Sequence, residues 1–534
     1  MSGTGTSEDP FVLTTVEDLS LIKDNMTANY SLGNDIALTT YWTIPKTNLM
    51  GSEIFKGTLD GNNYTISNFR IMNNQDYVGF FSKTDGATIK NLKLTDVQIT
   101  GTGSHVASIS GKSNNTTIDN VHATTKANQV GAISGLNNVS GLIAQTGGLV
   151  LISEPGTTTI KNSSFTGTIQ STGTNGANGG IVGNINTGSS VTNCTFNGRI
   201  NAFGTSGGIA GMNQGGEIKQ SAAKGEVTTL AYSGGIVGSQ NIRSGVNPVI
   251  EECYTDIAVS GSSGAGGIAG IAVGNIKNCF TIGSAYSSNV AAGITGFGGN
   301  ITIENCYTTS TVYGAAAAGI GYMIYGTNTI TNTYALNEYV TGLEEAYRIS
   351  NSGTMTDSYS WEYITNNGTQ MEIEGTEISK ETFWDTFSNE NTFWSAWSDE
   401  IWALNMNENF LLPVLKIQED VDADYAFDYQ PDEPTIIYKT VEVGGGGSGT
   451  VTIRETETVY VDSGNGSGSN GAQVVMGSDD TGNVSINDPA TGFGNEFGSG
   501  FNWWIVISGL LFVMLVVAWF YIRKYQEELN EIKI

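Results

Sequence analysis

One short phrase recurs through the middle of the chain: an aliphatic residue, any residue, Asn, and then a small or sulfur-containing residue. Its clearest copies begin at Ile66, Ile89, Ile118, Ile160, Val191, Ile276, Ile303 and Ile330, and looser copies begin at Ile218, Ile250 and Met355. From Ile250 to Met355 successive copies lie 26, 27, 27 and 25 residues apart. A repeat of this length is typical of a solenoid, in which each repeat forms one turn and packs only against its neighbours.

A second phrase, Gly-Gly-Ile-Ala/Val-Gly, alternates with the first, for example at Gly207–Gly211 and Gly266–Gly270. Its Ile is the only side chain with enough bulk to fill a core. We therefore expect two buried aliphatic columns that face each other, and an Asn column whose amides hydrogen-bond from turn to turn at a bend. The two aliphatic columns are Ile209, Ile236, Ile268, Ile294 and Ile320, and Ile218, Ile250, Ile276, Ile303 and Ile330.

The composition agrees with short strands joined by turns. The chain has 71 Gly, and only 14% of its residues are charged. Its formal net charge is −28, with no local basic patch, so we expect no binding of nucleic acid. The sequence thus predicts an all-β protein.

The four cysteines all follow the third residue of the first phrase, at Cys194, Cys253, Cys279 and Cys306. In a parallel stack equivalent side chains point the same way, which is poor geometry for a disulfide. We expect buried free thiols.

Several segments of the first 81 residues resemble the GLUG-motif family. They include Val16-Glu17-Asp18-Leu19, Phe55-Lys56-Gly57-Thr58-Leu59-Asp60-Gly61-Asn62, Tyr64-Thr65-Ile66-Ser67-Asn68 and Val78-Gly79-Phe80-Phe81. The resemblance covers roughly residues 3–418. It implies a right-handed parallel β-helix of the kind found in surface proteins, adhesins and the non-catalytic parts of some secreted peptidases, and it implies no catalytic residues.

The two ends of the repeat region differ from its middle. Residues 1–56 are predicted to form an N-terminal cap of strands and a helix, the helix being capped by Thr15. Residues 57–360 form the β-helix. Residues 361–418 contain Trp384, Trp394, Trp397 and Trp402, and we expect them to close the C-terminal end of the solenoid.

Beyond residue 418 the composition changes twice. Residues 419–502 are acidic and then rich in Gly and Ser, which predicts a stalk with a β-hairpin at 435–461. Residues 503–522 are twenty residues without a charge, which is enough to span a bilayer as one helix. Residues 523–534 would then be a short interior tail. The anchor is flanked by aromatic and basic residues, namely Trp503, Trp504, Trp519, Tyr521, Arg523 and Lys524.

One column of aromatic residues follows the cysteine position, and it is the candidate ligand-binding site. The column is Tyr254, Phe280, Tyr307, Tyr334 and Tyr359. Evenly spaced rings on an outer face could stack sugars, but aromatic stripes are also common as packing. Both interpretations stay open at this point.

The outward residues between Ile and Asn alternate in charge at Lys219, Glu251, Lys277 and Glu304, which indicates a solvated ladder. The chain shows no catalytic constellation, metal-binding set or cofactor motif, so we expect no enzyme activity.

The sequence therefore predicts a single-pass, surface-exposed, adhesin-like protein with its N-terminal domain outside. Its partners would be a membrane and a glycan or protein receptor, and the stalk or the transmembrane helix could form a homo-oligomer. A virion spike or structural coat protein is the first alternative, and a β-helical polysaccharide-degrading enzyme is the second. Sequons such as Asn25-Met26-Thr27, Asn63-Tyr64-Thr65 and Asn300-Ile301-Thr302 permit glycosylation.

Overall fold

The computed structural model describes most of residues 1–361 and a few segments after them. The described ranges are 1–43, 54–73, 75–126, 132–145, 157–337, 339–361, 365–366, 369–370, 375–378, 397–398, 400–403 and 412–416. The predicted stalk, hairpin, membrane anchor and tail, residues 419–534, lie outside them, as do Trp384 and Trp394. In the part of the chain that is described, no helix is long and apolar enough to cross a membrane.

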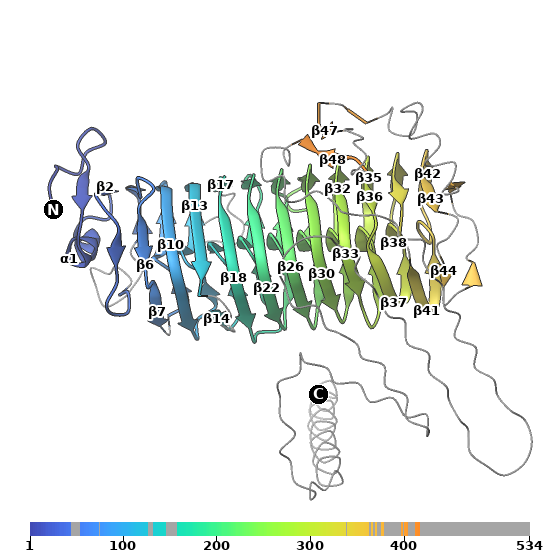
Figure 1. Ribbon diagram of the computed structural model, residues 1–534, viewed down its shortest axis with the longest axis horizontal. Coiled ribbons are helices and arrows are strands. Elements are labelled where there is room, and N and C mark those ends of the chain that lie inside the picture. The colour runs from blue at the N-terminus through green and yellow to red at the C-terminus, as the bar shows by residue number, and fades with distance from the viewer. Residues whose placement is uncertain are drawn as a thin grey trace, which may run out of the picture. The chain divides into compact units, whose positions relative to one another are not determined.

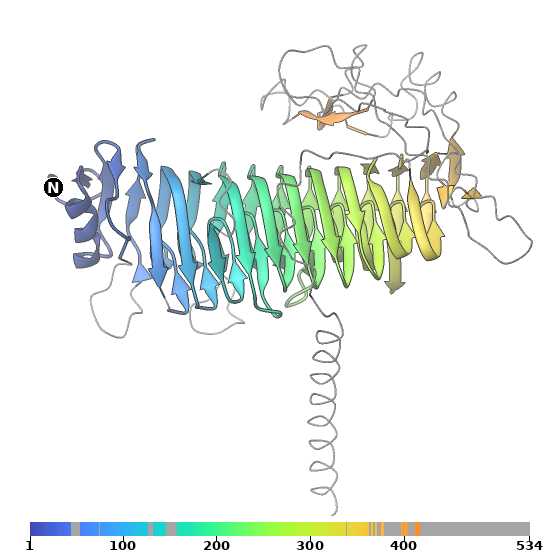
Figure 2. The ribbon, with the colours of Figure 1, turned by 60° about the horizontal axis from the view of Figure 1, so that its bottom comes forward.

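The chain winds into a parallel β-solenoid of about 11 turns (Figures 1 and 2). Among the described residues, forty-one strands belong to one continuous sheet, and the strands of successive turns pair in parallel. Equivalent residues lie opposite one another, as in Ile218↔Ile250 and Ile250↔Ile276. The predicted all-β parallel solenoid is confirmed.

One turn contains four strands: β23 (Thr205–Gly207), β24 (Ala210–Gln214), β25 (Glu217–Lys219) and the long β26 (Ala222–Thr229). The next turn repeats the order with β27 (Tyr232–Gly234), β28 (Val237–Asn241), β29 (Val249–Glu251) and β30 (Tyr254–Gly261). Gly207 and Gly208 lie at the bend between β23 and β24, where backbone atoms of the same turn and of the next turn leave no room for a Cβ atom. The Gly-Gly pair therefore allows the chain to turn closely around the single Ile that follows.

The same pattern extends in both directions from these two turns. Before them lie β10 (Thr88–Gly101), β13 (Thr117–Thr125), β17 (Thr159–Lys161), β18 (Ser164–Ser171), β19 (Ala177–Gly179), β20 (Val182–Asn186), β21 (Ser190–Thr192) and β22 (Thr195–Ala202). After them lie β31 (Gly264–Gly266), β32 (Ala269–Lys277), β33 (Phe280–Tyr286), β34 (Val290–Ala292), β35 (Thr295–Glu304), β36 (Tyr307–Thr308), β37 (Thr311–Ala318), β38 (Gly321–Tyr325), β39 (Thr329–Thr331), β40 (Tyr334–Ala335), β41 (Val340–Tyr347), β42 (Thr354–Thr356) and β43 (Tyr359–Trp361).

Both predicted aliphatic columns lie in the core. All ten of the isoleucines that form them, from Ile209 to Ile330, are fully buried and belong to one hydrophobic cluster. Burying a side chain of this size stabilises the folded state by about 2 kcal/mol. The repeated Ile positions thus account for a large part of the stability of each turn.

The Asn of the first phrase is a corner residue with a left-handed backbone. At every copy its φ angle lies between 47° and 56°. The corner residues are Asn68, Asn91, Asn120, Asn162, Asn193, Gln220, Glu252, Asn278, Asn305, Asn332 and Asp357. Among residues other than Gly, Asn tolerates this conformation best. The corner therefore explains why the phrase favours Asn and accepts Asp357, whereas Gln220 and Glu252 adopt the same angle without that preference.

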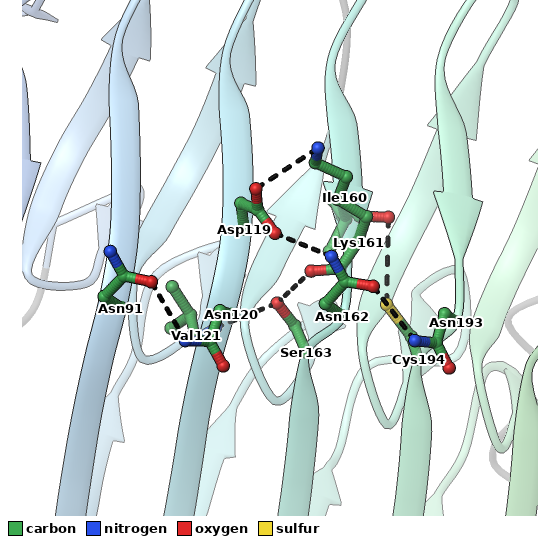
Figure 3. Close-up of polar contacts among 10 residues, drawn as sticks. All are labelled: Asn91, Asp119, Asn120, Val121, Ile160, Lys161, Asn162, Ser163, Asn193 and Cys194. Atoms are coloured by element: carbon green, nitrogen blue, oxygen red, sulfur yellow. Dashed lines mark hydrogen bonds and ion pairs between the residues drawn. The ribbon is translucent and has the colours of Figure 1, made fainter. Parts of the chain in front are cut away.

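The corner amides also form the expected column (Figure 3). Asn120 Nδ2 donates to Asn91 Oδ1 over 2.9 Å, and Asn193 Nδ2 donates to Asn162 Oδ1 over 2.9 Å. Asn305 bonds to Asn278 in the same way. These corners thus bind their neighbours through side chains as well as through the sheet, whereas Asn162 Nδ2 donates to Asp119 and not to the corner residue Asn120.

A short helical segment lies at the N-terminal end, beside β1 (Phe11–Leu13). Helix α1 (Val16–Ser20) is capped by Thr15, whose side chain accepts a hydrogen bond from Asp18 N, and η1 (Leu21–Asp24) follows it. The hydrogen bond from Thr14 N lowers the pKa of Asp18 to about 2. Leu19 and Ile22 are fully buried, so this segment extends the core past the first strands.

Candidate functional site

The aromatic residues of the predicted binding column do stack on one another. The ring centroids of Tyr254 and Phe280 are 5.3 Å apart, and those of Phe280 and Tyr307 are 5.0 Å apart. Tyr334 and Tyr359 continue the column, with centroids 5.1 Å apart. The parallel register produces this stacking directly, because Tyr254, Phe280, Tyr307, Tyr334 and Tyr359 occupy equivalent positions.

A segment from much later in the chain covers the middle of this column. We call it the strap, and it consists of residues 397–398, 400–403 and 412–416, including β47 (Trp402–Ala403) paired with β48 (Val414–Leu415). Trp402 lies 6.2 Å from the rings of both Phe280 and Tyr307. The hydroxyl of Tyr307 donates to the Pro413 carbonyl over 2.9 Å.

The strap removes the middle of the column from solvent. Phe280, Tyr307 and Tyr334 are at most 2% exposed, whereas Tyr254 and Tyr359 are partly buried. Burial raises the pKa of Tyr307 and of Tyr334. Ligand stacking on the three central rings requires the strap to move, and binding at this column stays a prediction.

The position of the strap differs from the plug that we expected at the end of the solenoid. Trp397 packs 5.7 Å from Tyr334, and its Nε1 donates to the Asn332 carbonyl. Trp402 reaches back to Phe280, which precedes the last described turns. These two tryptophans cover one side of the turns because the stacked rings there offer a large apolar surface.

A second pair of rings, further along the same two turns, is exposed. Tyr286 and Tyr313 are paired residues of β33 and β37, six residues beyond Phe280 and Tyr307. Their ring centroids are 5.3 Å apart and their planes differ by 7°. Tyr286 is 49% exposed and Tyr313 is 36% exposed. This pair was not predicted, although its spacing of 27 residues equals that of Phe280 and Tyr307 and could have revealed it.

The charged residues beside the corners form ion pairs between turns. Lys219 Nζ lies 3.4 Å from Glu251, and Lys277 Nζ lies 2.6 Å from Glu304. Lys161 pairs with Asp119 in the same way over 3.2 Å (Figure 3). All these side chains are partly exposed, so each pair contributes about 1 kcal/mol or less. The geometry fits the solvated ladder expected from the sequence.

The cysteines are free and buried. Each thiol donates to the carbonyl oxygen two residues earlier, for example Cys279 Sγ to Lys277 O over 3.0 Å. Burial raises the pKa of Cys194 to about 12 and raises the pKa of Cys279 as well. All four side chains belong to the hydrophobic core, where a buried cysteine packs as a small apolar residue.

The two histidines lie apart from acidic clusters. His105 stacks on Tyr77 with centroids 4.8 Å apart, and burial lowers the pKa of His105 to about 4. Burial also lowers the pKa of His122, whose ring bonds to Ser164 and Asn120. Among the described residues, no three His, Cys, Asp or Glu side chains are grouped so that they could hold a metal ion.

Comparison with known proteins gives a different functional context from the one we predicted. Residues 12–125 match the family model described as the N-terminal region of the M26 IgA1-specific metallo-endopeptidases. The chain is also 34% identical over 160 residues to halomucin from Haloquadratum walsbyi. That alignment covers 27% of this chain and only 2% of halomucin.

Two solved structures resemble the chain at low sequence identity. A protein assigned as an immunoglobulin A1 protease from Bacteroides ovatus is 18% identical, with a TM-score of 0.35 and coverage of 78% of this chain and 95% of that one. A structure named IgA1 protease is 20% identical, with a TM-score of 0.37 and coverage of 51% and 21%. At these TM-scores neither superposition establishes a shared fold.

The family match corrects two predictions from the sequence. An adhesin-like function was predicted, with a virion spike or coat protein and a polysaccharide-degrading enzyme as alternatives, but the match over residues 12–125 points to a protease-related protein. The prediction of no enzyme activity is contradicted by the same match, which points to a peptidase. The match names M26 peptidases where the sequence suggested the GLUG family, although a β-helical, surface-type protein is compatible with both. The error arose because the repeated residues specify the fold of the solenoid and do not indicate the activity of the protein that contains it.

Proposed function

We propose that this chain is part of a peptidase-related extracellular protein, in which the solenoid is a rigid, non-catalytic domain that holds a protein substrate. The observation that carries this proposal is the match of residues 12–125 to the N-terminal region of M26 IgA1-specific metallo-endopeptidases. The matched residues include α1, β1 and the first turns through β13. The proposal assigns cleavage to another part of the protein or to a partner.

The geometry of the described turns suits holding better than cutting. A continuous parallel sheet with two buried Ile columns makes a stiff support, since each turn is fixed by its two neighbours. Tyr286 and Tyr313 offer two stacked, nearly parallel rings that are exposed to solvent. Exposed tyrosines of this kind are common contact residues at protein interfaces. We place the substrate contact at this pair.

The predicted membrane anchor belongs to the same proposal. The segment 503–522 would hold the protein at a cell surface, with the solenoid outside. Halomucin and the IgA1 proteases support an extracellular or surface setting.

Immunoglobulin A1 is the first substrate to test, because the matched family is named for it. The full chain is immobilised, and binding of immunoglobulin A1 is measured by surface plasmon resonance, with immunoglobulin G as the control. In parallel the full chain is incubated with immunoglobulin A1 and zinc, and new N-termini are sought by mass spectrometry. We expect binding above the control and no cleavage.

Variants locate the contact. Tyr286→Ser with Tyr313→Ser should weaken binding by about tenfold or more, since removal of an interface tyrosine commonly costs 1–2 kcal/mol or more. Tyr325→Ser is the matched control, because Tyr325 is equally exposed and lies on β38. Binding no stronger than that of immunoglobulin G contradicts the holding role, and cleavage by this chain alone contradicts the non-catalytic role.

A further inference from the structure

The described residues contain several Asn-X-Ser/Thr sequons, and the fold presents them very differently. Their acceptor residues are Asn25, Asn29, Asn63, Asn114, Asn115, Asn138, Asn162, Asn193 and Asn300. An oligosaccharide can be transferred only to an Asn whose side-chain nitrogen is accessible and whose backbone can enter the transferase as a turn. The hydrogen bonds of each sequon therefore indicate which Asn can accept a glycan in the folded protein.

Asn25-Met26-Thr27 forms an exposed turn directly after η1. The Ala28 amide donates to the Asn25 carbonyl over 3.3 Å, which closes the turn. Thr27 N and Thr27 Oγ1 both donate to Asn25 Oδ1, over 3.2 Å and 2.9 Å. Asn25 and Thr27 are exposed, and no described residue accepts a hydrogen bond from Asn25 Nδ2.

This arrangement prepares the Asn25 amide for transfer. The Thr27 hydroxyl bonds to the amide oxygen and thus leaves the nitrogen facing solvent, and an Asx turn of this kind holds the three sequon residues in a compact loop. In the other sequons the Ser or Thr lies in a paired strand or is buried, as for Thr195 in β22, Thr65 in β6 (Thr65–Ser67) and Thr116.

The corner sequons use their amides for the column described above. Asn193 Nδ2 donates to Asn162 Oδ1, and Asn162 Nδ2 donates to Asp119 Oδ1 over 2.8 Å. A glycan on either nitrogen would break a bond between turns. Asn63 and Asn300 are exposed, but their Oδ1 atoms accept from Asn120 Nδ2 and Thr327 N and not from the sequon hydroxyl.

We propose that Asn25 is the N-glycan acceptor of the folded protein, and that the corner sequons stay unmodified. The donor is an oligosaccharide linked through its anomeric carbon to a polyprenyl pyrophosphate. Asn25 Nδ2 attacks that carbon, the carbon–oxygen bond to the pyrophosphate breaks, a nitrogen–carbon bond forms, and one amide proton leaves to a base of the transferase. The glycan then lies at the N-terminal end of the solenoid, beside α1.

The test uses the folded full chain, a purified oligosaccharyltransferase and the lipid-linked oligosaccharide, with peptide mass spectrometry to measure occupancy at each sequon. We expect occupancy of Asn25 to exceed that of Asn162 and Asn193 by roughly tenfold or more, because modification of the corner residues must break hydrogen bonds of the column. After denaturation the difference between these sites should shrink.

Point variants check that the modified residue is Asn25 and that modification requires its sequon. Asn25→Gln and Thr27→Ala should each abolish modification at this site, whereas Met26→Ala should leave it unchanged. A folded chain that stays bare at Asn25, under conditions in which the transferase modifies a control peptide, overturns the proposal. Equal modification of Asn25 and Asn162 in the folded chain overturns it as well.

Discussion

Two aromatic pairs lie on neighbouring turns, one on β33 and β36 and the other on β33 and β37, and they differ in their exposure to solvent. Phe280 of β33 and Tyr307, just before β37, are covered by the strap, whereas Tyr286 and Tyr313, six residues further on, are 49% and 36% exposed. Both pairs stack at close to 5 Å and repeat every 27 residues. The spacing of the repeat therefore determines which rings stack on each other, and contact with the strap determines which of them are buried.

The largest effect should come from weakening the contact between the strap and the rings that it covers. Trp402 is fully buried against Phe280 and Tyr307, so Trp402→Ala should lower the free energy of unfolding of the strap by about 3 to 5 kcal/mol. Hydrogen exchange should then show fast exchange at residues 412–416 while the amides of β26 stay protected. Unchanged protection of the strap in this variant would mean that the covered pair does not hold it.

Alkaline pH should have the next largest effect on stability, because it acts on the buried tyrosines of the covered column. Burial keeps Tyr307 and Tyr334 protonated above the ordinary pKa of 10.0, whereas the unfolded chain loses these protons near pH 10. The folded state then binds more protons than the unfolded state, so stability falls as pH rises above 10, by about 1.4 kcal/mol per pH unit for each tyrosine. Denaturant titrations at pH 9 to 11 measure this slope.

Tyr307→Phe provides the control for that titration. The variant has one buried phenol fewer, so its slope above pH 10 should be smaller than that of the parent chain by about 1.4 kcal/mol per pH unit. An unchanged slope would show that the Tyr307 hydroxyl loses its proton at the same pH in the folded and the unfolded state.

The smallest effect should come from the exposed pair. Tyr286→Ser should change the free energy of unfolding by no more than about 0.5 kcal/mol, because surface substitutions of this kind remove little packing. Thermal denaturation followed by circular dichroism measures the change. A loss comparable to that of Trp402→Ala would show that the outer face is covered along its whole length.

The sequence predicted the parts of this molecule that repeat. The Ile columns, the parallel register and the Asn column all follow from residues spaced by one turn, and each is present. The left-handed corner was missed, although Asn at one fixed position, replaced only by Gln220, Glu252 and Asp357, is the signal that could have revealed it.

The strap could not be located in the same way. Its contact between Tyr307 and Pro413 joins residues 106 positions apart, and nothing in the repeat marks where it lands. The apolar bulk of Trp397 and Trp402 indicated only that they would be buried. Burial of an aromatic column by such a segment depends on packing between distant parts of the chain. The spacing of the repeat does not predict that packing. The functional context was missed for a related reason, since an aromatic stripe and a rigid scaffold suit many kinds of surface protein.

The left-handed corner has a consequence for how such a chain can change over generations. The corner residue of each turn has nearly the same φ angle, and successive turns pair through parallel strands. A whole turn can therefore be duplicated or lost without a new type of contact between turns. Each such event alters the reach of the scaffold by about 4.8 Å. The distance between whatever sits at the two ends is therefore adjustable in fixed increments, as on a ruler whose divisions are single turns.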